Sequence, residues 1–396
     1  MALFSQHNFL SIFFASLIGA ASYLPYETFA IFLNIFPFGS YPSTLTYISN
    51  VWGTWGVFLC IGYLFLTMFV SKLRVKLDFF TTLAVNTLTG IFTILLACYK
   101  VKLDRVENGT DYYIVTNSNL IETCVKVTSF LRYLSLWSNF GFLFNYDGVL
   151  ACWGGFGTAF YIIPAFIITY AISLTKYSIP FEHARAIYII YGILTLCAVP
   201  GAIYFFYKVI PKTSWAHSSH QQSSQARVSQ DPYYNQGYDH VPTEREAIKS
   251  PSIFTFFVLA VPYCFFFPSL CNGLYRKFSR NHSPYFSSPS MACYLGTYLG
   301  TSVGFLMYKV KTPKFFFSLI IAACSFVLWL CTWFTKSWKT ANVLGMLGSV
   351  ACSIICFWGF SRCWVGEPYR STYTVTIMFF ILLFFVFDWI SSYIFT

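Results

Sequence analysis

Apolar runs about as long as a membrane is thick fill this chain, and one polar stretch interrupts them. A transmembrane helix needs about 20 apolar residues. Six such runs precede the polar stretch, at 9–36, 47–70, 79–99, 121–144, 149–174 and 186–209, and five follow it, at 252–270, 290–308, 315–335, 341–361 and 373–395. The sequence therefore predicts an all-α, polytopic membrane protein of about eleven helices in two bundles.

The composition agrees with a protein that lies in lipid. Hydrophobic residues make up 57% of the chain and charged residues only 10%, whereas soluble domains carry about 25% charged residues. The net charge of +11 would suggest nucleic acid in a soluble protein. Here most Lys and Arg lie in short loops between apolar runs, where they contact lipid headgroups. We expect the lipid bilayer as a partner and no nucleic acid.

The polar stretch 211–250 is rich in Ser, Gln and His and shows neither a helical nor a strand period. Such a segment cannot bury enough apolar surface to offset its ordering entropy. It is predicted to be a disordered cytosolic loop between two membrane parts. The predicted domains are an N-terminal six-helix bundle at 1–210, the loop at 211–250 and a C-terminal five-helix bundle at 251–396.

The loops also indicate an orientation. Lys and Arg slightly favour the loops after even-numbered runs, which predicts a cytosolic N-terminus. The two glycosylation sequons, at Asn108 and Asn281, both lie in loops after odd-numbered runs and hence on the opposite side. We expect a multi-pass integral membrane protein, in the plasma membrane rather than an internal one.

Charged residues within apolar runs cost about 2.5–3.5 kcal/mol each on insertion scales and therefore need partners or water. Lys126 can extend toward the nearby end of its run, and Asp388 lies close to the end of the chain. Arg132 lies deeper. Glu27 follows Pro25, and a proline-broken helix with an acidic side chain is a recurrent way to line a substrate cavity. A simple kink is the alternative at this position.

No pattern for enzymatic chemistry or metal binding is present. Most of the thirteen cysteines lie in apolar runs without a C-x-x-C pair, as expected of small packing residues. There is no H-E-x-x-H, no G-x-S-x-G and no P-loop. The glycines from Gly154 to Gly157 predict close helix packing rather than phosphate binding. We expect no cofactor, no metal and no enzymatic activity.

The first apolar run resembles the equilibrative nucleoside transporter family. That family has a Leu-Pro-Trp-Asn pattern followed by Phe, and Leu24, Pro25 and Phe29 match it. Tyr26 stands for the Trp and Glu27 for the Asn. A G-x-x-G at Gly154 and a Phe-Pro at Phe267 also resemble family patterns, as does the layout of six runs, loop and five runs.

The chain also departs from that family. Thr297 and Thr301 stand where the family usually has Asp and Arg around a shared Gly. The family's Gln-Gly-Ser region maps loosely onto the neighbourhood of Asn139, and its Asn-Gly-Tyr onto that of Trp358. Several polar groups are thus replaced, which bears on the cargo more than on the fold.

The resemblance implies a major-facilitator-like transporter that moves nucleosides or nucleobases by alternating access between two bundles. The expected substrate-binding residues are Tyr26, Glu27, Arg132, Asn139, Thr297 and Trp358. Burial of Glu27 would favour its neutral form, which would link transport to protons. The alternatives are a solute carrier of the same fold with a different small polar cargo, and a membrane protein that no longer transports.

Overall fold

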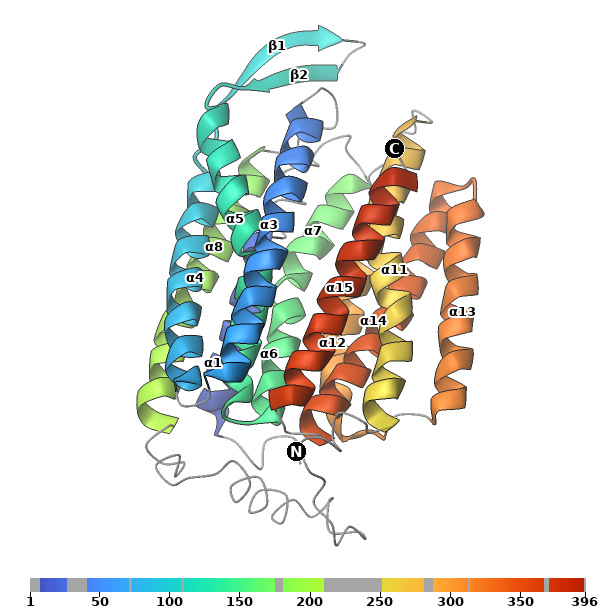
Figure 1. The fold of residues 1–396 in the computed structure, drawn as a ribbon. Coiled ribbons are helices and arrows are strands. Elements are labelled where there is room, and N and C mark those ends of the chain that lie inside the picture. Colours follow the sequence, from blue (N-terminus) through green and yellow to red (C-terminus); the bar gives the residue numbers. More distant parts are fainter. Residues whose placement is uncertain are drawn as a thin grey trace, which may run out of the picture.

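The computed structural model describes residues 8–26, 41–70, 73–107, 110–174, 181–209, 251–280, 288–311, 314–366 and 370–394. The predicted loop at 211–250 lies outside these residues, as do Glu27, Asn108 and Asn281. Upright helices dominate the described part, and α1 begins at the end of the molecule opposite to that where α15 finishes (Figure 1).

The helices before the polar stretch form one bundle. They are α1 (Phe9–Ala21), α3 (Tyr41–Phe69), α4 (Arg74–Leu96), α5 (Ser118–Phe144), α6 (Gly148–Phe160), α7 (Ile163–Ser173) and α8 (Phe181–Tyr204), which continues into the π-helical turn Phe205–Val209. The predicted run 149–174 is two helices because the chain turns at Tyr161 and Pro164 lies in the first turn of α7. Proline suits a first turn, where its missing N–H has no helical partner.

The helices after the polar stretch form a second bundle beside the first (Figure 1). They are α11 (Pro251–Arg280), α12 (Ser288–Leu306), α13 (Phe315–Phe334), α14 (Trp338–Gly366) and α15 (Arg370–Ile394), with the 3₁₀ turn Met307–Lys309 after α12. The predicted fold class, an all-α membrane protein in two bundles, is confirmed for the described residues.

Seven helical segments of the described residues are long and apolar enough to cross a membrane. Two shorter apolar segments, Ile253–Phe265 and Thr372–Phe387, lie in α11 and α15. The predicted runs in α5 and α12 are not among them. Both helices carry many buried Ser, Thr and Asn side chains, which lower their hydropathy but face protein rather than lipid. This is a multi-pass integral membrane protein.

A β-hairpin at the upper end was not predicted. Strands β1 (Val101–Glu107) and β2 (Thr110–Val115) pair antiparallel and project beyond the helix ends (Figure 1). The Tyr99 hydroxyl ties the hairpin base to the bundle, because it donates to the Phe181 carbonyl at 2.7 Å. The sequence signal was present, since alternating β-branched and aromatic residues flank an Asn-Gly pair.

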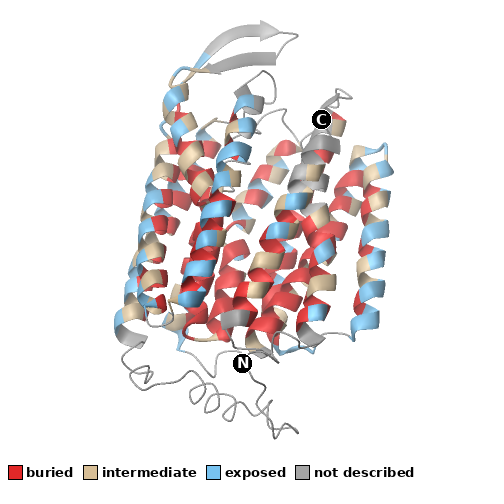
Figure 2. Ribbon diagram, in the orientation of Figure 1, coloured by how far each residue is buried: buried red, intermediate tan, exposed pale blue. Residues whose placement is uncertain are grey.

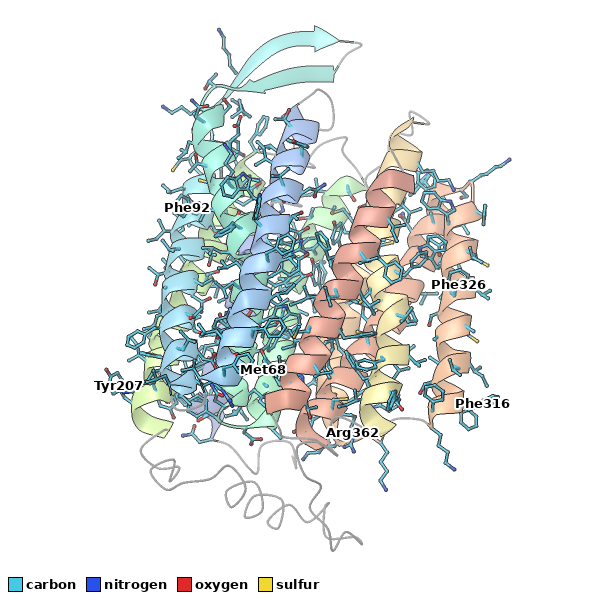
Figure 3. The ribbon with its side chains drawn as sticks, in the orientation of Figure 1. Met68, Phe92, Tyr207, Phe316, Phe326 and Arg362 are labelled. Atoms are coloured by element: carbon cyan, nitrogen blue, oxygen red, sulfur yellow. The ribbon has the colours of Figure 1, made fainter. Side chains whose placement is uncertain are left out.

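Burial is greatest where the two bundles meet, and the outward faces of α4 and α13 are exposed (Figure 2). Phe316 projects from the outer side of α13 (Figure 3), which is the side expected to meet lipid, whereas the Phe326 ring lies 6.1 Å from that of Phe265 on α11. Apolar rings on that surface need no protein partner in a membrane.

Two glycine seams hold helices close together. A Cβ at Gly19 of α1 would overlap the carbonyl of Gly154 in α6. On α12, a Cβ at Gly296 or Gly300 would lie 2.5 Å from a carbonyl oxygen of α14. Small residues are what allow membrane helices to approach so closely. The predicted packing role of the Gly154 region is confirmed.

Candidate functional site

A cavity lies between the two bundles. Its space between atoms amounts to about 650 Å³, which includes the part open to solvent. It is lined by Tyr23, Arg132, Tyr133, Leu136, Trp137, Phe140, Thr158, Ala159, Tyr263, Thr297, Tyr298, Thr301, Phe305, Phe357, Phe360, Trp364, Phe380 and Phe384. Both bundles thus contribute to one chamber.

One face of α5 forms the N-terminal wall. Arg132, Tyr133, Leu136, Trp137 and Phe140 all line the cavity, and their spacing of three and four residues places them along a single stripe of the helix. The stripe begins with a cation and continues as a ridge of large apolar side chains. This wall therefore has one strongly polar end.

Aromatic rings of α14 and α15 form the C-terminal wall. Phe360 lies 5.3 Å from Trp364 and 5.1 Å from Phe380 between ring centroids. Trp364 also lies 5.3 Å from Phe140 of the opposite bundle. Edge-to-face and tilted contacts of this kind are favourable for aromatic pairs. They give the cavity flat, apolar sides.

Arg132 contacts Tyr26, so these two predicted site residues lie together. Its guanidinium carbon lies 3.3 Å from the ring centroid of Tyr26, and 5.0 and 5.7 Å from those of Tyr133 and Phe384. Contacts between a cation and a ring face are attractive, the more so when water is excluded. Tyr26 therefore supports the cation that faces the cavity, and Phe384 extends the contact to the second bundle.

Asn139 lies behind the α5 wall and not on its cavity face. It exchanges amide hydrogen bonds with Asn86 of α4, at 3.0 and 3.1 Å. Its amide nitrogen also lies 3.0 Å from the Ser22 hydroxyl and 3.1 Å from the Ile18 carbonyl. All these groups are buried. The network joins α4 and α5 to the end of α1, where the helix is interrupted at Ser22.

The other predicted site residues are placed apart from this network. Thr297 lines the cavity from α12, and its hydroxyl donates to the Cys293 carbonyl at 2.9 Å. Trp358 does not line the cavity, and its indole N–H donates to the Val310 carbonyl at 2.9 Å, beyond the end of α12. Glu27 lies outside the described residues, so its proton-linked role stays a prediction.

Several contacts join the two bundles near the start of α15, at the lower end of Figure 1. The hydroxyl of Tyr373, near the start of α15, donates to the Trp137 carbonyl of α5 at 2.5 Å. The Tyr373 ring stacks on Phe144 at 5.0 Å. On the same interface, the Cys152 thiol lies 3.8 Å from the Ser361 carbonyl. These contacts link α5 and α6 to α14 and α15.

Sequence reasoning missed most of the aromatic lining. Trp137 and Phe140 follow Arg132 at helical spacing, and Phe357, Phe360 and Trp364 share a face of α14. That spacing was a usable signal. It was hidden by the abundance of aromatic residues, which form 22% of the chain and also fill the lipid-facing surface.

No known protein family and no curated protein matches this sequence. Among solved structures, the chain is similar to the xylose transporter XylE from E. coli in a partially occluded, inward-open conformation. The identity is 11%, the TM-score is 0.47, and the match covers 96% of this chain and 89% of that one. A likeness of this strength does not identify a cargo. The resemblance to equilibrative nucleoside transporters stays a prediction.

Proposed function

We propose that this protein is a transporter that moves nucleosides or nucleobases across a membrane by alternating access. The observation that supports the proposal most is the cavity itself, which is lined by helices from both bundles. A chamber between two bundles can open to either side when one bundle rocks against the other. Flat aromatic sides suit the faces of a base.

Arg132 is the cation of this chamber and the residue whose loss should affect transport most. It faces the cavity and holds three aromatic rings from both bundles around its guanidinium. Lysine would keep the charge but lose the planar group that stacks on Tyr26. Arg132 is therefore proposed to contact the solute or to hold the wall that does.

Flux of labelled nucleosides and nucleobases into proteoliposomes tests the proposal. The matched control is Lys126→Ala, because Lys126 lies on the same helix but pairs with Glu122 at 3.9 Å outside the cavity. We expect Arg132→Ala to lower flux at least about tenfold and Lys126→Ala to leave it unchanged. Absence of flux for every nucleoside and nucleobase would overturn the proposal.

The proposed orientation places the N-terminus and the 211–250 segment in the cytosol of a plasma-membrane protein. It is supported by the distribution of Lys and Arg between loops. Protease added to intact cells should leave the 211–250 segment uncut, and the same protease should cut it after permeabilisation. Cleavage in intact cells would reverse the orientation without affecting the transport proposal.

A further inference from the structure

Two of the three threonines that line the cavity, Thr158 and Thr297, have fixed hydrogen-bonding roles. The Thr158 hydroxyl donates toward the carbonyls of Gly154 and Gly19, at 3.0 and 3.1 Å. The Thr297 hydroxyl donates to the Cys293 carbonyl at 2.9 Å. A hydroxyl has one proton and two lone pairs. Because both protons are directed into the protein, these two side chains can offer the cavity only acceptors.

The α5 wall offers the opposite kind of group. The Arg132 guanidinium carries N–H donors and no acceptor, and an indole nitrogen is also a donor only. The Trp137 side chain lines the cavity and is 2% exposed, and its buried indole N–H has no hydrogen-bond partner among the described residues. A buried donor without a partner is costly.

The cavity therefore has the Thr158 and Thr297 acceptors on α6 and α12, the Arg132 donors on α5, and aromatic rings, some of them tyrosines with a hydroxyl of their own. A solute that satisfies all three has flat faces, N–H donors and carbonyl acceptors. Helices α6 and α12 pack against each other, so the two threonines lie on neighbouring helices of the wall.

We infer that the cavity recognises the edge of a flat heterocycle in which N–H and C=O groups alternate, with Thr158 and Thr297 accepting from ring N–H groups. This inference rests on the proposed function and narrows it, since it assigns recognition to the ring rather than to an attached sugar. The affinity of a solute should then depend on whether its ring carries N–H groups. A ring methylated at these nitrogens keeps its carbonyls and flat faces, loses every donor and gains a methyl group at each nitrogen.

Uracil and 1,3-dimethyluracil provide the test, because a methyl group replaces the hydrogen at each of the two ring nitrogens and the rest of the ring is the same. Equilibrium binding of labelled uracil is measured on the purified full-length protein in detergent, with unlabelled uracil, uridine and 1,3-dimethyluracil as competitors. Uracil should bind, uridine should compete no better than uracil, and 1,3-dimethyluracil should compete at least about tenfold more weakly.

Thr297→Val adds a residue-specific readout, since valine keeps the shape and removes the acceptor. It should weaken uracil binding about tenfold and leave competition by 1,3-dimethyluracil unchanged. Thr332→Val is the control, because the Thr332 hydroxyl is also bonded to its own helix, at 2.8 Å from the Leu328 carbonyl, but lies outside the cavity. The comparison of the two competitors needs no variant and holds even if Thr297→Val folds poorly.

Equal competition by uracil and 1,3-dimethyluracil would overturn the inference. So would unchanged uracil binding in a well-folded Thr297→Val protein. In either case, flux of labelled nucleosides or nucleobases would leave the transport proposal standing. Failure of every base and nucleoside to bind or cross would overturn both.

Discussion

The two walls of the cavity are supported in different ways. Behind the α5 wall, Asn139 and Asn86 join three helices through directional hydrogen bonds. The α14 wall instead contacts α12 along a glycine seam and is covered by aromatic rings such as Phe360 and Trp364. Directional bonds fix one arrangement of α1, α4 and α5. Ring and glycine contacts set a distance but tolerate small shifts, so we expect the second bundle to change more in its packing when the cavity opens.

The largest effect on folding should come from the glycine seams, of which each bundle contains one. Gly19→Leu and Gly300→Leu both place a side chain where the neighbouring backbone lies. Overpacking of this kind costs about 3 kcal/mol or more, and we expect little folded protein from either variant. Gly62→Leu is the control, since nothing lies within 4 Å of a Cβ there. Size-exclusion profiles and thermal unfolding in detergent measure the amount and stability of folded protein. A Gly300→Leu protein that folds like the wild type would show that α12 and α14 can move apart at this seam.

The amide network distinguishes the first bundle from the second. Asn139→Leu should lower stability by about 2 kcal/mol, because it leaves the Asn86 amide buried without its partner. Thr332→Val in the second bundle should change stability by less than about 0.5 kcal/mol, since that hydroxyl bonds only within its own helix. Thermal unfolding compares them. Equal losses would remove the contrast between the walls.

A double variant sharpens this measurement. Removing both amides with Asn86→Leu and Asn139→Leu should cost less than the sum of the single changes, because no amide partner then remains unsatisfied. The coupling is read from the four unfolding midpoints. Strictly additive midpoints would mean that the two amides stabilise the bundle independently, despite their separation of 3.0 Å.

The hydrogen bond between the walls should have a smaller effect. Tyr373→Phe removes a bond of about 1 kcal/mol to the Trp137 carbonyl, which corresponds to about fivefold more frequent separation of the lower end. Cys152 reports this, because its buried thiol lies on the same interface. Its alkylation rate, followed by peptide mass spectrometry, should rise about fivefold. Tyr207→Phe, at an exposed lower-end residue (Figure 3), should leave the rate unchanged.

The smallest effect is expected at the edge of the second bundle. The Lys277 ammonium donates to the carbonyls of Trp333 and Thr335, at the C-terminal end of α13. A cation there is worth about 0.5 kcal/mol. Lys277→Met should therefore lower the unfolding midpoint slightly, whereas Lys336→Met, at an exposed lysine nearby, should not. A large decrease in the unfolding midpoint of Lys277→Met would mean that the packing of α13 depends on this contact.

The sequence predicted the helices, whereas its Asn-Gly signal for the hairpin was missed and the cavity wall could be predicted only in part. Apolar runs identify helices because lipid requires every backbone group to be bonded within the segment. The spacing of Arg132, Leu136 and Phe140 predicts a shared face of α5, but not which bundle that face meets. Asn139 was expected to contact a solute, and the structure places its amide against Asn86. Which partner satisfies a buried amide depends on helices far apart in the chain, and a single sequence does not contain that information directly.

The hairpin β1–β2 gives the molecule a landmark outside its helices. Most of the described residues lie in the helix bundles. The hairpin projects beyond the bundles at the end opposite to the start of α1 (Figure 1). A binder raised against these strands would decorate one face of a reconstituted vesicle and leave the other bare. Counting decorated molecules would then report how the protein inserts, and the added mass would let small particles be aligned in electron micrographs.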